Sequence, residues 1–124
     1  MWNTIRLELA RSAEAPLGRS DCGYEITAPV GPGGMLLPDA WKADRGRAVV
    51  RRFWRGEDDE QGKLIHTRHR TWAVSYVPGE ADDEPLYRLE GHQLTRGEYV
   101  SITERDGVTR TFQVAGVRPA AARL

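Results

Sequence analysis

Apolar and polar residues alternate along several short segments of this sequence, and glycine or proline separates one segment from the next. Ile5, Leu7 and Leu9 alternate with charged residues, and residues 24–30 repeat the pattern. A period of two places every second side chain on the same face of an extended strand. The 13 glycines and 7 prolines leave few windows in which apolar residues keep a helical spacing. The pattern therefore predicts an all-β fold.

The C-terminal part of the chain gives the clearest local prediction. Residues 98–104 and 108–114 both alternate, and Asp106-Gly107 between them favours the tight turn of a β-hairpin. We expect further strands over about 5–9, 24–30, 47–55, 63–77 and 86–92. Six or seven such strands predict a small antiparallel, partly closed barrel or a compact sandwich. A helical turn is expected only at 38–43, with Trp41 turned inward, and in the tail.

Length, charge and cysteine content limit the class of protein. A chain of 124 residues is the size of one domain, which we place at 1–118, followed by a frayed tail at 119–124. The formal net charge is zero, which argues against a binder of long nucleic acids or anionic membranes. A single cysteine, Cys22, and the lack of a signal peptide or a long apolar segment are typical of a cytoplasmic protein.

Basic and aromatic residues gather between positions 45 and 72. If 63–77 is one continuous strand, alternation puts His66, Arg68, Arg70 and Trp72 on one face. Arginine forks bind carboxylate and phosphate oxygens, and exposed tryptophans offer flat contact area. We therefore expect a surface that binds a small anionic ligand or an acidic patch of a protein. Its predicted residues are Arg51, Arg52, Trp54, His66, Arg68, Arg70 and Trp72.

Other functions use the same residues. A metal-assisted enzyme would need His66, His69 and His92 as ligands, but residues three apart on a strand point to opposite faces unless a bulge intervenes. A structural subunit would bury the basic and aromatic face against a second copy, as in a homodimer. A binder of single-stranded nucleic acid would use it for stacking. No nucleophile motif is present, so the sequence favours a binding module without a cofactor over an enzyme.

Two acidic segments, 57–60 and 82–84, fall between expected strands. Their adjacent carboxylates do not follow the spacing of a calcium loop. We interpret them as solvated loops that keep the chain soluble.

Three stretches carry a family resemblance. They are Arg51-Arg52-Phe53-Trp54 with the following Gly56, Gly62 and His66, then Gly23-Tyr24-Glu25, and the run Gly97–Ile102. They resemble a group of short proteobacterial proteins to which no activity is assigned. The resemblance implies a bacterial protein and transfers no site residues.

Overall fold

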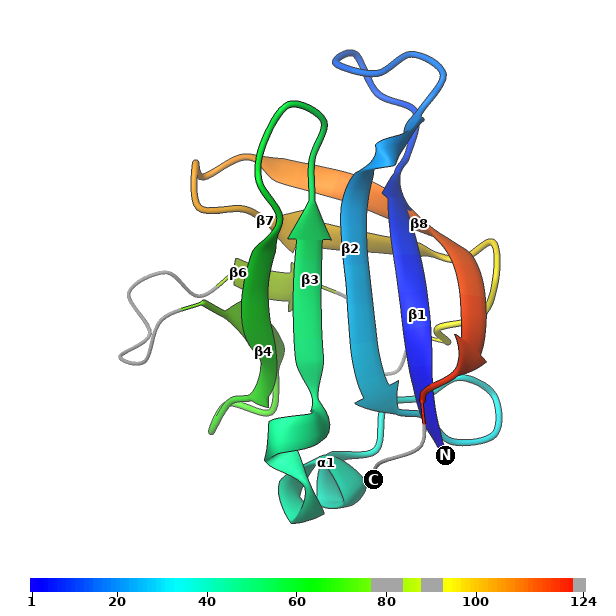
Figure 1. Cartoon of the computed structure of the whole chain (residues 1–124), viewed down its shortest axis with the longest axis vertical. Helices are drawn as coiled ribbons and strands as arrows, with labels where there is room; N and C mark the ends of the chain where they lie inside the picture. The colour runs from blue at the N-terminus through cyan, green and yellow to red at the C-terminus, as the bar shows by residue number, and fades with distance from the viewer. Residues whose placement is uncertain (77–83, 88–92, 122–124) are drawn as a thin grey trace.

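The described part of the chain forms an eight-stranded antiparallel β-barrel. A computed structural model describes residues 1–76, 84–87 and 93–121, and within these each strand pairs with the next while β8 pairs with β1 (Figure 1). The all-β prediction is confirmed, and of the two predicted architectures the barrel is present. In chain order the elements are β1 (Trp2–Leu9), β2 (Arg19–Pro29), α1 (Pro38–Ala43), the 3-10 turn η1 (Arg45–Arg47), β3 (Val49–Phe53), β4 (Glu60–His66), β5 (Trp72–Ser75), β6 (Glu84–Tyr87), β7 (Tyr99–Thr103) and β8 (Thr109–Pro119).

The inward faces of the strands are the ones that alternation predicts. Ile5 on β1 lies opposite Ile26 on β2, and Val100 on β7 lies opposite Phe112 on β8. All four side chains are buried, and the Tyr24 ring meets the Phe112 ring edge to face with 5.2 Å between centroids. Closure of the barrel pairs the first strand with the last, so neither is left as an open edge.

The continuous strand predicted at 63–77 is wrong. β4 ends at His66 and β5 begins at Trp72, because residues 67–71 form a turn in which Thr71 accepts a backbone hydrogen bond from Thr67 at 2.8 Å. The hydroxyl of Thr67 also accepts the backbone N–H groups of His69 and Thr71, each at 3.3 Å. Such local bonds compete with extended structure. Arg70 takes a left-handed backbone conformation with φ of 62°, so alternation does not continue through the turn.

The remaining boundaries differ from the expected ones by a few residues. β3 is shorter than 47–55 because η1 occupies its beginning. β8 reaches Pro119, and the amide of Ala120 donates to the carbonyl of Trp2 at 3.0 Å, so the expected tail at 119–124 begins inside the sheet. Residues 88–92 of the expected fifth strand lie outside the described residues.

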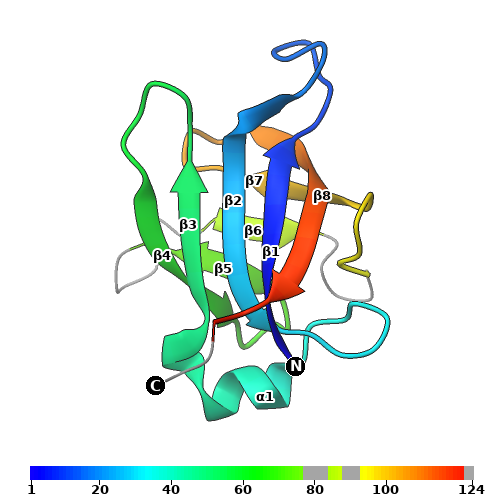
Figure 2. The same cartoon turned by 45° about the vertical axis from the view of Figure 1, so that its right-hand side comes forward.

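The helix α1 lies across one end of the barrel, where β1 begins (Figure 2). Pro38 stands in its first turn, which tolerates the missing N–H, and the buried indole of Trp41 donates from Nε1 to the carbonyl of Leu64 at 2.8 Å. The predicted helical turn and the inward direction of Trp41 are thus confirmed. The loops between β1 and β2 and between β3 and β4 lie at the other end (Figures 1 and 2). No helix in the described part of the chain is long and apolar enough to cross a bilayer.

Candidate functional site

The seven residues predicted to form one surface lie in three places. Arg51 faces outward on β3, where it pairs with Glu25 at 3.0 Å and with Asp59 at 2.8 Å. Arg52 and Trp54 lie at the barrel end opposite α1, and the other four lie near α1. The expectation of a single surface is wrong, because β3 and β4 run along the barrel and carry their ends apart.

A group that we call the arginine cluster occupies the end opposite α1. Its centre is the carboxylate of Glu104, which is 5% exposed. This carboxylate accepts hydrogen bonds from Arg52 Nε at 2.8 Å, Arg110 Nη1 at 2.7 Å and the Tyr24 hydroxyl at 2.5 Å. The guanidinium of Arg52 also lies over the Trp54 ring, 4.3 Å from its centroid. The cluster therefore joins β2, β3, β8 and the turn after β7 by contacts distant in sequence.

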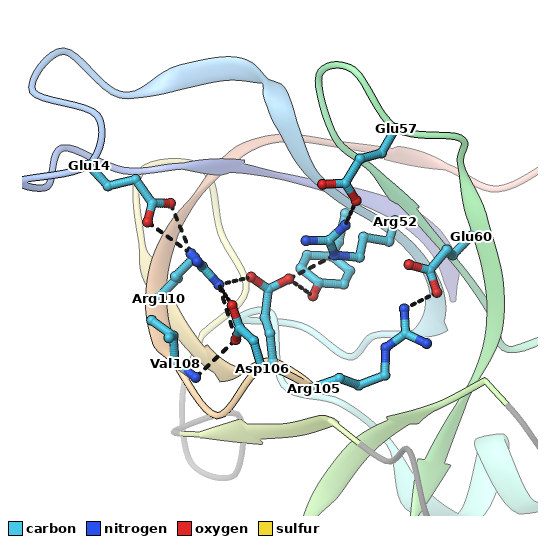
Figure 3. A network of polar contacts seen from close by, with 10 residues as sticks. Glu14, Arg52, Glu57, Glu60, Arg105, Asp106, Val108 and Arg110 are labelled. Carbon is cyan, nitrogen blue, oxygen red and sulfur yellow. Dashed lines mark hydrogen bonds and ion pairs between the residues drawn. The ribbon is translucent and has the colours of Figure 1, made fainter.

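Three loop carboxylates complete the cluster (Figure 3). Arg110 pairs with Glu14 at 2.9 Å and with Asp106 at 3.1 Å, and Arg52 pairs with Glu57 at 3.3 Å. Burial disfavours the charged form of Arg52, but the hydrogen bond and negative charge of Glu104 outweigh it and raise the pKa of the guanidinium. Two arginines thus face four carboxylates. This excess of negative charge makes Arg52 and Arg110 poor receptors for an added anion.

A groove of about 770 Å³ opens at the other end, between α1 with η1 and the turn that joins β4 to β5. Its basic lining residues come from three elements of the chain: Arg45 from η1, Lys63 and His66 from β4, and Arg68 and His69 from the turn. Trp41 and Leu64 supply aromatic and apolar lining. We call this the basic groove.

Aromatic rings form one wall of the basic groove. His66 lies directly opposite Trp72 across the β4–β5 pair, and their ring centroids are 4.4 Å apart. Trp41 meets both rings edge to face, at 6.0 Å from His66 and 5.8 Å from Trp72. Trp72 is only 3% exposed, so it supports His66 from beneath and does not line the groove. This packing fixes the His66 ring.

The cations of the basic groove contrast with those of the arginine cluster. Arg45 lies flat over the Trp41 ring, 4.7 Å from its centroid, and Lys63 Nζ donates to the carbonyl of Gly46 at 3.1 Å. Among the described residues no carboxylate pairs with Arg45, Lys63 or Arg68, and none lines the groove. Their charge is therefore not neutralised by this part of the chain.

Sequence reasoning found part of this groove. Of the predicted residues, His66 and Arg68 line it, whereas Arg70, in the same turn as Arg68, is not among the lining residues. Trp41, Arg45 and Lys63 were not among the predicted site residues. No helical spacing marks Arg45, because it lies in η1 beyond the end of α1.

The metal alternative rested on His66, His69 and His92. The turn brings His66 and His69 to the same groove, which a continuous strand would not do. Within the residues that the structure describes, no group of three histidine, cysteine or acidic side chains could hold a metal ion, and His92 lies outside them.

Comparisons with protein-family models, with curated proteins and with solved structures found no match for this chain.

Proposed function

We propose that this protein is a binding module for a small anionic ligand, which it holds in the basic groove. The observation that carries the proposal is the set of cations there, Arg45, Lys63 and Arg68, with no carboxylate partner among the described residues. A bound anion would supply the missing negative charge.

The two arginines suit oxyanions. The planar guanidinium of Arg45 is held against the Trp41 ring, so less freedom is lost when it binds a phosphate or carboxylate. Arg68 approaches from the turn on the other side of the groove. Each hydrogen bond to a charged group contributes on the order of 1.5–3 kcal/mol, so two such contacts support dissociation constants from millimolar down to roughly tens of micromolar.

The dimensions favour a small ligand over a polymer. The groove volume of about 770 Å³ lies within the range of small-molecule sites. The formal net charge of the chain is zero, whereas binders of long polyanions usually carry an excess of basic residues.

Binding of phenyl phosphate, measured by isothermal titration calorimetry at low salt, tests the proposal. We expect Arg68→Gln and Arg45→Gln each to weaken binding about tenfold, because each removes one charged contact. The matched control is Arg51→Gln, an arginine of β3 that is already paired with Glu25 and Asp59 outside the groove. It should bind phenyl phosphate as the parent protein does.

Two outcomes would reject the proposal. One is the absence of phenyl phosphate binding at millimolar concentration. The other is an equal loss of affinity in Arg51→Gln and Arg68→Gln, which would mean that binding follows overall charge and not the groove. Binding that weakens as salt rises supports the ionic contacts, because salt screens charges near the surface.

A further inference from the structure

A second hollow lies beside the basic groove, along the outer face of β4. This hollow, of about 470 Å³, is lined by Val49, Gly62, Lys63, Ile65, Ser75 and Tyr76 together with Gln61. Lys63 and Ile65 line both hollows, so the two are adjacent. We call the second one the apolar strip.

The strand register explains why the apolar strip is on the outside. Leu64 is 1% exposed and points into the barrel, so its neighbours Lys63 and Ile65 point outward. Val49 and Ser75 lie opposite Lys63 on the two flanking strands. Val49 is 39% exposed, which makes it one of the few large apolar side chains of the barrel wall left in contact with water.

Gly62 leaves room for the Tyr76 ring to pack against the backbone of β4. A Cβ atom at this position would lie 3.0 Å from the Tyr76 ring and 2.9 Å from the carbonyl oxygen of Ser75. The ring therefore lies close against the strand and adds an apolar surface. From Gln61 to Ile65 the strand rises about 13 Å, the length of an alkyl chain of roughly ten carbons.

We infer that the ligand of the basic groove is a single-chain anionic amphiphile, whose head group lies between Arg45 and Arg68 and whose alkyl chain lies along Val49 and Ile65. This inference rests on the proposed function and adds the chemical class of the ligand. Charge complementarity supports it, since none of the described residues that line either hollow is a carboxylate, and all the basic lining residues except the shared Lys63 belong to the basic groove alone. The head group of an amphiphile would neutralise the cations, and its alkyl chain would cover the exposed Val49 and the partly buried Ile65.

A chain-length series of alkyl phosphates tests the inference. We compare ethyl phosphate with hexyl phosphate by calorimetry, below the concentration at which hexyl phosphate forms micelles. Burial of a methylene is favourable by about 0.8 kcal/mol when it is complete. In an open groove we expect roughly half of this, or about tenfold tighter binding of hexyl phosphate over the four added methylenes.

Variants of exposed valines locate the alkyl chain. Val49→Gln should remove most of the gain from ethyl to hexyl phosphate, while leaving ethyl phosphate binding unchanged. The matched control is Val117→Gln on β8, because Val117 is 40% exposed and lies outside both hollows. The Val117→Gln variant should keep the full gain in affinity from ethyl to hexyl phosphate. Ile65→Thr, which retains a branched Cβ suited to a strand, should act as Val49→Gln does.

Each outcome separates the inference from the proposed function. Equal affinity for ethyl and hexyl phosphate overturns the inference and leaves the anion site standing. A chain-length gain that persists in Val49→Gln overturns the placement of the chain. Binding of hexanol as tight as that of hexyl phosphate overturns the link between head and chain. Failure of both phosphates to bind overturns the proposed function itself.

Discussion

The two ends of this barrel hold similar side chains and use them differently. In the arginine cluster, guanidinium groups pack on Trp54 and bond to buried or nearby carboxylates. In the basic groove, Arg45 packs on Trp41 in a comparable way, but no carboxylate of the described residues reaches it. The comparison teaches that an arginine beside a tryptophan indicates a ligand site only when its charge has no partner within the protein.

One hairpin supplies both ends. β3 brings Arg52 to the arginine cluster, and the paired strand β4 carries Lys63 and His66 towards α1. Both strands carry basic and aromatic residues, so their sequences alone do not distinguish the two ends. The difference arises from residues far along the chain: Glu104 lies 52 positions from Arg52, whereas the β4–β5 turn contributes only basic and neutral side chains to the groove.

The largest effect should follow from loss of the carboxylate in the arginine cluster. Glu104→Ala leaves Arg52, Arg110 and the Tyr24 hydroxyl without their shared acceptor in a buried site. Breaking a buried ion pair in this way costs on the order of 3–5 kcal/mol. We expect the free energy of unfolding, measured by urea titration, to fall by that amount.

Glu57→Gln is the control for this prediction. Glu57 also pairs with Arg52, but its side chain is 56% exposed, and exposed pairs contribute only about 0–1 kcal/mol. If Glu104→Ala were no more destabilising than Glu57→Gln, the cluster would not hold the barrel end together and the comparison between the two ends would fail.

A smaller effect is expected where the groove meets the core. Trp41→Phe keeps an aromatic ring under Arg45 but removes the Nε1 donor, which leaves the buried carbonyl of Leu64 without that hydrogen bond. An unsatisfied buried acceptor costs about 1–3 kcal/mol. Thermal unfolding should show this loss, and phenyl phosphate binding should weaken only slightly because the ring remains. A complete loss of binding in a folded Trp41→Phe protein would contradict the role of the ring as a flat support.

The sequence predicts the strands and buried faces of the barrel wall, but it does not predict the contacts at the two barrel ends. Alternation identified the buried faces around Ile5 and Phe112, and Asp106-Gly107 identified the last hairpin, because both signals are local. The turn at 67–71 contains no glycine or proline, and its stabilising hydroxyl bonds from Thr67 are not visible as a pattern. The long-range contacts of Glu104, and the meeting of Arg45 with the β4–β5 turn in one groove, depend on how the barrel closes, which alternation alone does not specify.

Lowering the pH should weaken the ion pairs of the arginine cluster, because these depend on charged carboxylates. The backbone N–H of Val108, together with Arg110, holds the pKa of Asp106 below its ordinary value of 3.8. A carboxylate with a lowered pKa adds stability that is present above its unfolded pKa and is lost as the pH falls through the folded one. Asp106→Asn keeps the acceptor for the Val108 amide and removes the charge. Its melting temperature should lie below that of the parent at pH 7, and the difference should shrink below about pH 4.

The comparator for this experiment is Arg68→Gln, which removes a charge at the other end. Its melting temperature should follow that of the parent through the same pH range, because Arg68 has no carboxylate partner among the described residues. If the difference in melting temperature between the parent and Asp106→Asn stayed constant down to pH 2.5, the effect would come from the altered side-chain packing and not from the lost charge.

The smallest effect on stability is expected in the basic groove, and it is the most direct test of the contrast between the two ends. Lys63→Gln, Arg45→Gln and Arg68→Gln remove cations that no described carboxylate neutralises, so each should change the free energy of unfolding by no more than about 0.5 kcal/mol. The double variant of Arg45 and Arg68 should be neutral or slightly stabilising, since like charges repel when they face the same hollow.

Urea titration without ligand measures these changes in the free energy of unfolding, with Arg110→Gln as the comparator from the arginine cluster. A protein that tolerates loss of these cations in its fold but loses phenyl phosphate binding has them for the ligand. If loss of the groove cations destabilised the fold as much as Arg110→Gln does, these cations would have a structural role like that of the arginine cluster and not a role in ligand binding.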